Sequence, residues 1–495
     1  MEQDIARDIA FQGIPGTRLL IEHSDAEVVH LPHPTSSPDD PLNWKWKRKY
    51  FAQTIIFIWV LLLAAATLSP PVTYGPVIAE LGASSSYLNI GAALSVLMLG
   101  LGNLFFNPLA LCFGRRHVYL VATIIGAISQ VITATAQTKA TFIGSRVLLG
   151  FGAAPYEQLP ALTVDDQFFV HHRGLGLSIY TLALTMGSFL GPVASGFIVS
   201  DMGWRWVYWF YAIFLFATVV LIFFGLEETG FPKRTVQENN DEQTEYSRKT
   251  YTDKLKLITS FPTSNFYSAA TTPLLLLADP IIWWCGILYG FGIAWLMIMA
   301  YESPTIFTLY GFGPSTLGLT NISPLIGACL IVWLGGAGTD RFMVWKARRN
   351  NGVMEPETRI YSVFFAGPVM GAGLILYGVG AAQGIHWVGP IIGMGMIGSA
   401  LPIAAEVSLG YVSESYPSLA GEATTTVIAI RNIIGCMMTF AIGPWIKTSG
   451  LRDTFITVGL LAFAVFISGI LLIWRGKNCR KMGARRYYAI VAKKW

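Results

Sequence analysis

The sequence contains little charge for its length. Only 13% of its 495 residues are Asp, Glu, Lys or Arg, whereas 53% are hydrophobic, and the mean hydropathy is +0.52. A soluble domain of this size needs a more polar surface than this composition supplies. The composition therefore excludes an ordinary soluble protein and predicts segments that cross a bilayer.

The sequence also lacks the motifs of several functional classes. No Gly-x-x-x-x-Gly-Lys-[Ser/Thr] loop is present, so we do not expect this chain to pump with ATP. The histidines are isolated apart from His171-His172, and no group of His, Asp and Cys has metal-ligand or nucleophile spacing, so we expect neither an enzyme nor a metal site. Residues 1–40 hold no apolar segment, so we expect no cleavable signal peptide.

Long apolar runs recur along the chain. A transmembrane helix needs roughly 20 apolar residues, because a rise of about 1.5 Å per residue then covers a hydrocarbon core of about 30 Å. A β-barrel would instead show segments of about ten residues with alternating polarity, and none is present. The runs predict twelve transmembrane helices, over residues 50–73, 88–110, 118–137, 140–163, 175–199, 206–226, 280–302, 315–337, 360–382, 387–411, 422–445 and 452–474.

A polar stretch separates these runs into two sets of six. We expect it to be a solvated cytoplasmic linker, with room for a short amphipathic helix on the membrane surface. This division is typical of transporters built from two parallel repeats with a substrate path between them. The predicted fold class is therefore an all-α membrane protein with twelve transmembrane helices in two six-helix pseudo-repeats. The predicted domains are an N-terminal segment (1–49), a first half (50–226), the linker (227–278), a second half (279–475) and a basic tail (476–495).

The basic residues indicate how the chain crosses the membrane, because Lys and Arg gather on cytoplasmic loops. With both termini inside, only Lys139, Arg205, Lys447 and Arg452 of the 34 basic residues fall on the outer side. We therefore expect a multi-pass protein of the plasma membrane with both termini in the cytoplasm. The net charge of +5 then lies mainly beside the inner leaflet, which favours contact with membrane lipid over binding of nucleic acid.

The loop between the second and third predicted spans carries a short basic motif, Phe-Gly-Arg-Arg-His. It resembles the loop signature of the major facilitator superfamily, Gly-x-x-x-Asp-Arg-x-Gly-Arg-Arg, and matches it at Gly114, Arg115 and Arg116. Leu111 and Cys112 stand where the family has an acidic and a basic residue.

In the family this loop latches onto neighbouring helix ends and biases the equilibrium between inward-open and outward-open states. Because the acid is missing, the resemblance implies a different latch in the first half. The equivalent loop of the second half keeps a charged pair, Asp340 and Arg341. A simpler alternative is that the basic residues only anchor the topology, but the recurrence in both halves favours the latch.

Glycines surround a proline in the fifth predicted span, at Gly187, Gly191, Pro192 and Gly196. Small residues at this spacing let two helices approach closely, and proline frees a carbonyl group and permits bending. The pattern Gly-x-x-x-Gly-Pro-x-x-x-Gly resembles the antiporter motif of drug/proton exchangers within the superfamily. The resemblance implies export rather than import, and plain helix packing is the alternative.

Charged residues inside the spans are the candidate coupling and substrate residues. A buried Arg costs roughly 2.5–3.5 kcal/mol in hydrocarbon, so each charge should face a partner or a watery cavity. In a continuous fourth span, Arg146 and Glu157 would lie about 20° apart on one helix face and line one path. Arg146 resembles the family's fourth-helix arginine, which is implicated in proton coupling. Glu157 is the candidate for protonation or for contact with a cationic substrate.

In the second half, Glu406 and Arg431 are the acid and the base best placed to meet. A pair of this kind suits either a structural or a functional role. The alternative for the fourth-span charges is likewise a buried ion pair that only orients helices.

Further segments resemble one fungal branch of the superfamily: residues 40–44, 166–174, 348–352, 355–359, 414–417 and 431–432. They are similar to the drug/proton antiporter family with twelve spans, in a fungal group of metabolite and toxin efflux pumps and of polyamine and cation permeases. Membership implies alternating access, in which two halves rock around a central site and proton movement drives the substrate.

Two hypotheses for the function follow. The first is proton-coupled export of a small organic molecule such as a fungal secondary metabolite or toxin. The second is proton-driven uptake of polyamines or other cationic nutrients, motivated by Glu157 and Glu406. The expected partners are a small-molecule substrate, protons and membrane lipid, for a monomer without a cofactor. A membrane enzyme or a seven-helix receptor fits poorly, because catalytic clusters are lacking and twelve spans are predicted.

Overall fold

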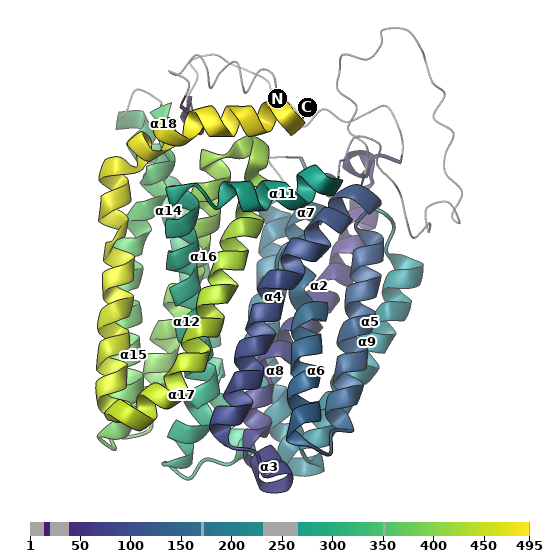
Figure 1. Ribbon diagram of the computed structural model, residues 1–495, viewed down its shortest axis with the longest axis vertical. Helices are drawn as coiled ribbons and strands as arrows, with labels where there is room; N and C mark the ends of the chain where they lie inside the picture. The colour runs from purple at the N-terminus through teal and green to yellow at the C-terminus, as the bar shows by residue number, and fades with distance from the viewer. Residues whose placement is uncertain (1–13, 20–38, 170–172, 231–265, 350–352, 495) are drawn as a thin grey trace.

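The computed structural model of the protein describes residues 14–19, 39–169, 173–230, 266–349 and 353–494. Within these residues the protein is a bundle of long helices that lie side by side (Figure 1). The strands found there have two residues each, and β1 (Arg18–Leu19) pairs antiparallel with β2 (Val353–Met354). The predicted all-α fold class is therefore confirmed.

The helices of the first half follow the predicted spans, with some of the spans divided into shorter helices. They are preceded by the short helix η1 (Pro41–Asn43). Their bounds are α2 (Trp46–Leu68), α3 (Pro70–Leu81), α4 (Ser85–Phe113), α5 (Arg116–Ala134), α6 (Lys139–Ala153), η2 (Ala154–Glu157), α7 (Leu159–Gln167), α8 (Arg173–Met202) and α9 (Trp204–Gly225).

The second half begins after the predicted linker, of which residues 231–265 lie outside the described residues. The short helix α11 lies in the described part of this linker and crosses the bundle near the end where both termini lie (Figure 1). The bounds are α11 (Phe266–Leu276), α12 (Pro280–Thr308), α13 (Pro314–Thr320), α14 (Ile322–Arg349), η4 (Pro356–Ser362), α15 (Val363–Ala382), α16 (Val388–Ser415), η5 (Pro417–Leu419), α17 (Ala420–Ile467) and α18 (Gly469–Lys494).

The number of membrane-spanning helices differs from the prediction. Among the described residues, ten helical stretches are long and apolar enough to cross a membrane. Two places account for the difference from twelve. The fourth predicted span is divided into α6, η2 and α7, and the last two predicted spans lie in one stretch, residues 417–492. That stretch bends at Gly450, whose φ of 77° is a conformation that glycine adopts without steric cost. The count of twelve stays a prediction.

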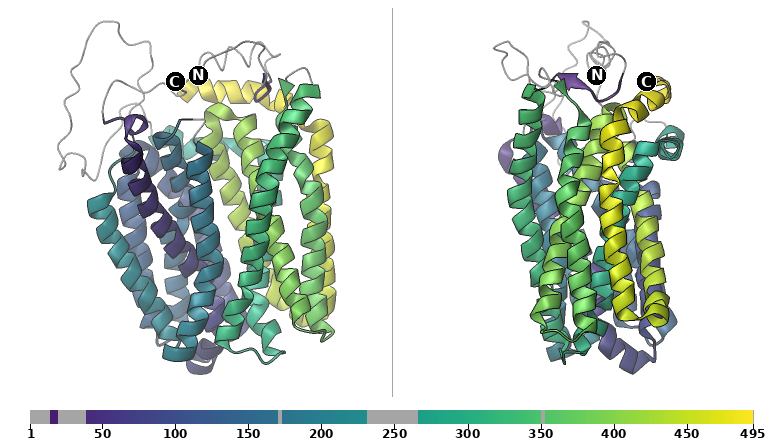
Figure 2. Two further views of the ribbon diagram at one scale, coloured as in Figure 1. Left: turned by 180° about the vertical axis from the view of Figure 1, so that it is seen from behind. Right: turned by 90° about the vertical axis from the view of Figure 1, so that its left-hand side faces the viewer.

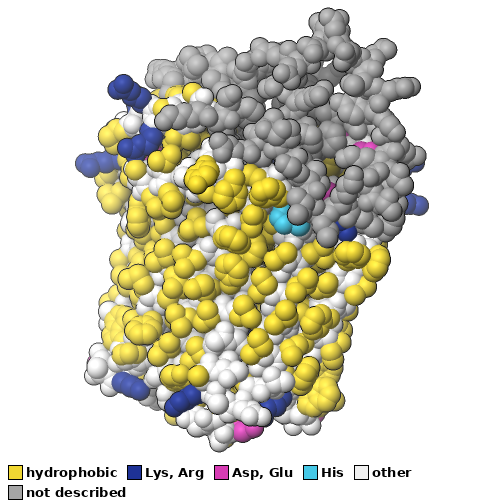
Figure 3. Space-filling model, turned by 45° about the vertical axis from the view of Figure 1, so that its right-hand side comes forward, with side chains coloured by type: hydrophobic (Ala, Val, Ile, Leu, Met, Phe, Trp, Pro, Cys, Tyr) yellow, Lys and Arg dark blue, Asp and Glu magenta, His cyan; other side chains and the backbone are white. Residues whose placement is uncertain are grey.

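The flank of the bundle is apolar. In Figure 3, hydrophobic side chains cover the visible side, and Lys and Arg gather near its two ends. On α9, Ile213, Phe214, Val220 and Phe224 are each more than half exposed. An exposed apolar surface of this extent marks contact with another apolar phase. The protein is therefore a multi-pass membrane protein.

Helices α2–α9 lie on one side of the bundle and α12–α18 on the other (Figure 2). The two sides meet where α4 packs against α17 and where α8 packs against α13. Most buried hydrophobic residues of α12–α18 form one cluster, which also includes Phe189 of α8 and Leu276 of α11. Most of those of α2–α9 form two clusters, one of which includes Met297 and Tyr301 of α12. The domain bounds given above stay a prediction.

Residues from both ends of the chain meet at one end of the bundle. Arg480 of α18 is completely buried and donates to Glu357 at 2.7 and 3.0 Å and to Glu355 at 2.7 Å. It also donates to the carbonyl oxygen of Pro15 at 2.8 Å, beside the pairing of β1 with β2. Residues 476–494 of the predicted tail therefore belong to α18, and Arg480 holds the described N-terminal residues inside the protein.

This contact is expected to weaken in acid. Burial alone would raise the pKa of Glu355, but hydrogen bonds from Lys477 and Arg480 outweigh it and lower the pKa below its ordinary value. A lowered pKa in the folded state adds stability that is present above the ordinary value of about 4.3 and is lost as the pH falls through the folded value. The protection factors of residues 14–19 against hydrogen exchange, corrected for the intrinsic rate at each pH, should therefore fall at acid pH.

The matched variant is Glu355→Gln, which removes the charge but keeps the size. We expect it to weaken the local contact by about 1–2 kcal/mol at neutral pH, since charge-assisted hydrogen bonds become neutral ones. The protection factors of the variant should show little further dependence on acid pH, whereas those of Glu80→Gln at the far end of the bundle should match the wild type. Equal exchange in wild type and Glu355→Gln would show that this carboxylate does not hold the segment.

Candidate functional site

The fourth predicted span is interrupted near its middle. Helix α6 ends at Ala153, and η2 follows with Pro155 near its start. Proline lacks the amide hydrogen that an α-helix needs, so a tighter turn replaces the helix here. Glu157 ends this turn, and α7 begins two residues later. Because of the interruption, the side chain of Glu157 points in a different direction from the one that a continuous helix would give it.

Glu157 forms a buried ion pair with Arg431 of α17, which belongs to the other half. The two side chains are only 8% and 5% exposed. The second carboxylate oxygen of Glu157 accepts hydrogen bonds from Asn432 at 3.0 Å and from Asn103 of α4 at 3.2 Å. Both oxygens of the buried carboxylate are thus satisfied, as a buried charge requires.

Small and aromatic residues complete the surroundings of the ion pair. A Cβ atom at Gly100 of α4 would lie 2.8 Å from the Cβ of Asn432, so glycine allows the close approach of α4 and α17. The guanidinium of Arg431 lies 4.7 Å from the ring centre of Tyr289, a cation–π contact. The hydroxyl of Tyr180 donates to the main-chain carbonyl of Glu157 at 3.0 Å. Residues of α4, α8, α12 and α17 therefore converge on one buried charge pair.

The predicted pairing of Glu406 with Arg431 is wrong. Glu406 of α16 forms an ion pair with Arg359 at 3.2 Å, and Arg359 is also paired with Glu414. Arg431 lies on the face of α17 that packs on α4 and meets Glu157 instead. The direction in which each side chain points from its helix determines its partner. The spacing of charges along the sequence does not give this direction.

The prediction of a continuous helical face through Arg146 and Glu157 is also wrong, because α6 ends between them. Arg146 lies on α6 and donates to the carbonyl oxygens of Ala66 and Thr67, at 3.1 and 2.9 Å. These carbonyls belong to the last turn of α2, where carbonyl groups lack partners within the helix and favour a nearby cation. The two charged residues therefore occupy separate environments, and their role in proton coupling stays a prediction.

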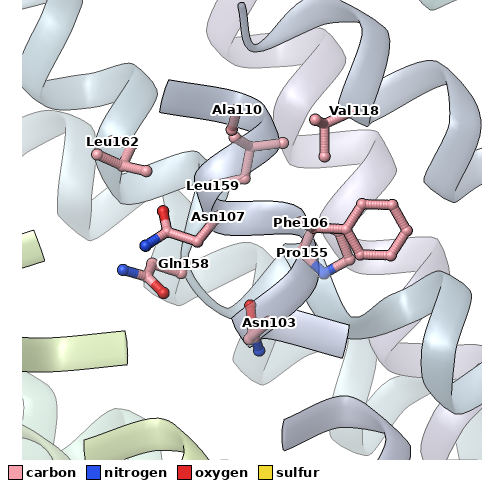
Figure 4. A pocket seen from close by; sticks show the side chains of 9 residues that line it. All are labelled: Asn103, Phe106, Asn107, Ala110, Val118, Pro155, Gln158, Leu159 and Leu162. Atoms are coloured by element: carbon pink, nitrogen blue, oxygen red, sulfur yellow. The ribbon is translucent and has the colours of Figure 1, made fainter. Parts of the chain in front are cut away.

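A second polar contact joins the two halves beside the ion pair. The hydroxyl of Thr425 on α17 accepts two hydrogen bonds from the other half. One comes from Gln158, between η2 and α7, at 2.6 Å, and one from Asn107 of α4, at 2.8 Å. Figure 4 shows their amides close together beside a small cavity, with Asn103 next to it. The cavity has a volume of about 10 Å³, roughly that of one water molecule. Polar groups thus line the α4/α17 contact over several turns.

The antiporter-type glycines lie at two close helix contacts. A Cβ atom at Gly187 would lie 2.4 Å from the carbonyl oxygen of Leu61, and one at Gly191 would lie 2.7 Å from the Cα of Ala65, both on α2. A Cβ atom at Gly196 would lie 2.6 Å from the carbonyl oxygen of Pro314 and 3.1 Å from the Cα of Gly318, in the other half. The carbonyl oxygen of Pro192 in turn faces Gly318, 2.8 Å from where a Cβ atom would lie there. Each glycine therefore faces backbone that cannot move aside as a side chain could.

The basic loop before α5 is held by acids from elsewhere in the chain. The carboxylate of Glu228, which follows α9, accepts the amide hydrogens of Arg115 and Arg116 at 2.8 and 3.0 Å. Arg115 also forms an ion pair with Asp166 of α7 at 3.0 Å. Gly114 has a φ of 104°, and a Cβ atom there would lie 2.5 Å from the carboxylate of Glu228. Arg116 is buried and donates to the carbonyl oxygen of Phe223 at 2.6 Å.

Comparison with known proteins identifies the family. The family model described as Major Facilitator Superfamily matches residues 54–439. The chain belongs to the Major Facilitator Superfamily. An uncharacterized MFS-type transporter of Schizosaccharomyces pombe is 28% identical over 97% of this chain and 94% of its own length. A Saccharomyces cerevisiae protein named "Probable drug/proton antiporter YHK8" is 24% identical, over 79% of this chain and 76% of its own.

A solved structure shows the same fold. The crystal structure of the human organic anion transporter MFSD10 matches with a TM-score of 0.57 and 18% identity, over 86% of this chain and 99% of that one. The protein is thus a transporter-type member of the superfamily, and its relatives are membrane transporters.

The loop before α5 leads to a prediction. The carboxylate of Glu228 caps the first turn of α5. Glu228→Gln should lower the stability of the purified protein by about 1 kcal/mol, because the cap and its charge at a helix N-terminus are both weakened. Thermal unfolding in detergent measures the effect.

The neighbouring Glu227 provides the control, since it forms a partly exposed ion pair with Arg48. Glu227→Gln should change stability by less than about 1 kcal/mol. Equal losses in the two variants would contradict a specific role for Glu228. In the second half, Asp340 and Arg341 lie on α14, and their side chains are outside the described part of the structure.

Several residues of the site were missed by the sequence analysis: Asn103, Asn107, Gln158, Tyr289, Thr425 and Asn432. Asn103 and Asn107 are polar side chains within an otherwise apolar span, which is a recognisable signal because such groups need partners in a membrane. Tyr289 gave no signal, since aromatic residues are frequent along the whole chain.

Proposed function

We propose that this protein is a proton-coupled efflux pump that exports a small organic molecule, such as a fungal secondary metabolite or toxin, by alternating access. The observation that carries the proposal is the position of the antiporter-type glycines. Gly187 and Gly191 abut α2, and Gly196 touches Gly318 of the other half. A close contact between halves is where a change of packing alters access to a central site. The name of the yeast relative, a drug/proton antiporter, supports the same direction.

The central ion pair suits the same cycle. Glu157 and Arg431 join α4, η2 and α17 across the two halves in a buried setting. A substrate that enters between the halves meets this pair together with the rings of Tyr180 and Tyr289. A site that combines aromatic faces with a few fixed polar groups favours small organic molecules.

The uptake hypothesis receives less support. It is motivated by Glu157 and Glu406, and each of these acids is paired with an arginine. A cationic substrate would have to displace that arginine from charge-assisted hydrogen bonds, which are the strong ones. The pairing therefore favours a neutral or weakly charged cargo over a polyamine.

We further propose that the pump acts as a monomer in the plasma membrane with both termini in the cytoplasm. Residues 14–19 and α18 lie at the same end of the bundle, which supports placing both ends of the chain on one side. The excess of basic residues on that side supports the cytoplasm as its location.

Transport in cells tests the direction of movement. Cells that overproduce the protein should retain less of the neutral lipophilic dye Nile red than cells that lack it, and a protonophore should abolish the difference. Labelled spermidine uptake should be equal in the two strains. Raised spermidine uptake with unchanged Nile red retention would overturn export in favour of uptake. A strain with the Arg431→Gln variant controls for effects of overproduction alone.

A further inference from the structure

Another buried carboxylate lies apart from the central pair. Glu302 is near the end of α12 that is remote from the termini, and it is only 6% exposed. The side-chain amide of Asn89, on α4 in the other half, donates to its Oε1 at 3.0 Å. Thr305, one turn further along α12, also hydrogen-bonds to the carboxyl group. Glu302 thus joins the two halves at the end opposite the termini.

Glu302 has no basic partner among the described residues, unlike Glu157 and Glu357. Glu157 is paired with Arg431, while Glu357 is paired with Arg480. A carboxylate buried without a counter-charge is costly, and such a group lowers its free energy by taking up a proton.

The amide of Asn89 indicates which form is present. Its nitrogen is used by Glu302, while its oxygen Oδ1 is buried and has no donor within the described structure. An ionised carboxylate has only acceptors and leaves Oδ1 without a donor, whereas a protonated carboxyl supplies one O–H donor. A protonated Glu302 can therefore donate to Oδ1 while it accepts from the amide nitrogen, and the two groups then form a closed pair of hydrogen bonds.

The other titratable and charged groups nearby do not supply a positive charge to this carboxyl. Tyr74 of α3 and Tyr377 of α15 lie within the electrostatic reach of Glu302, and Tyr301 precedes it in α12. Arg146 of α6 faces Tyr74 and Tyr301, but its guanidinium donates to two carbonyl oxygens at the end of α2. The tyrosines are neutral donors and acceptors. The neighbours of the carboxyl group are therefore uncharged, except for Arg146, which is already hydrogen-bonded to main-chain carbonyl groups.

We propose that Glu302 is the residue that carries the coupling proton, and that the protonated carboxyl bonded to Asn89 closes the end of the bundle remote from the termini. This inference rests on the proposed function as a proton-coupled transporter. Loss of the proton removes the O–H donor and leaves a charge without a counter-charge in a buried site, which favours entry of water and separation of α4 and α12 at this end. Uptake of the proton restores the closed pair. The central Glu157, neutralised by Arg431, then serves the substrate path rather than the proton.

Infrared difference spectroscopy on the purified protein in lipid nanodiscs tests the proton directly, because a protonated carboxyl has a C=O stretch that a carboxylate lacks. The wild type should show this band at neutral pH and lose it in alkali, and Glu302→Gln should lack it. The control is Glu80→Gln at the same end of the bundle. Hydrogen bonds from Arg205 and Trp204 lower the pKa of Glu80, so it is already ionised and its variant should keep the band. A band of full size in Glu302→Gln would overturn the proposal.

A second variant keeps the test open should Glu302→Gln fail to fold. Asn89→Leu retains the acid but removes its partner, so the band should remain and shift in frequency, because the hydrogen bond from the amide to the carboxyl group is lost. An unshifted band would contradict the paired arrangement.

Transport separates this inference from the proposed function. Glu302→Gln should lose pH-driven Nile red export while it retains exchange of dye down its own gradient. Export by the wild type together with full pH-driven export by Glu302→Gln would overturn only the role of Glu302. If the wild type showed the Glu302 band but no export of any probe, the proposed function would fail and the protonation of Glu302 would stand.

Discussion

Arg431→Gln is expected to abolish transport and to destabilise the protein by about 3–5 kcal/mol, the loss typical of removing one partner of a buried ion pair. The variant leaves the carboxylate of Glu157 in a site where it is only 8% exposed. The amides of Asn103 and Asn432 remain, but two neutral donors cannot replace a full positive charge. The measurements are thermal unfolding in detergent and Nile red export in cells.

The double variant Glu157→Gln/Arg431→Gln separates loss of attraction from the cost of an unpaired charge. It removes both charges and retains the hydrogen-bonding amides, so its stability should recover by a large part of the loss in the single variant. Transport should stay low if the charge pair takes part in the cycle. Recovery of both stability and transport would show that the pair has only a structural role.

Arg205→Gln is the matched control for the same residue type. Arg205 forms an ion pair with Glu80 at the surface of the protein, where the side chains are 35% and 48% exposed. Exposed pairs contribute about 0–1 kcal/mol, so this variant should lie close to wild type in stability and transport. If Arg205→Gln lost as much stability and transport as Arg431→Gln, the position of the arginine within the protein would not determine the effect of its replacement.

Gly196→Val is expected to slow transport about tenfold and to shift the protein toward the state that is open at the end remote from the termini. A Cβ atom there would lie 2.6 Å from the carbonyl oxygen of Pro314 and 3.1 Å from the Cα of Gly318. Both obstacles are backbone atoms, so α8 and α13 must separate to make room. Overpacking of this kind costs about 1–3 kcal/mol, and the cost falls on the closed state in which these helices touch.

Spin-label distances between α8 and α13 measure this shift, together with the rate of Nile red export. Gly75→Val on α3 is the control, because a Cβ atom at Gly75 meets nothing within 4 Å. Its transport and distances should match the wild type. Slow transport with unchanged distances in Gly196→Val would contradict the opening of this contact and would place the effect within α8 itself.

The sequence was sufficient to predict where long apolar helices lie. Runs such as 88–110 and 206–226 are predominantly apolar, and α4 and α9 cover them except for the last residue of the second run. Their position depends on local composition, because each backbone hydrogen bond of a helix is made within the same segment. The loop before α5 and the glycines of α8 were also visible, since their residue types restrict the local backbone.

Breaks inside helices were harder to predict. Pro155 and Pro160 stand in an apolar run like other prolines of this chain, yet α8 continues through Pro192 while α6 ends before Pro155. A proline interrupts or bends a membrane helix according to what neighbouring helices offer to the freed backbone groups. That choice depends on tertiary packing and not on the local sequence.

The sequence by itself determined the class of the protein: its low charge and long apolar runs require helices in a bilayer, and the family follows from motifs with fixed local spacing. Only the tertiary structure decided the partners of the buried charges. Glu157 met Arg431, and Glu406 met Arg359, over separations of 274 and 47 residues. Spacing along one helix fixes which residues share a face, whereas rotation and packing of separate helices decide which faces meet. The low charge noted at the outset therefore identifies a membrane protein, and the placement of the few charges that remain defines its candidate site.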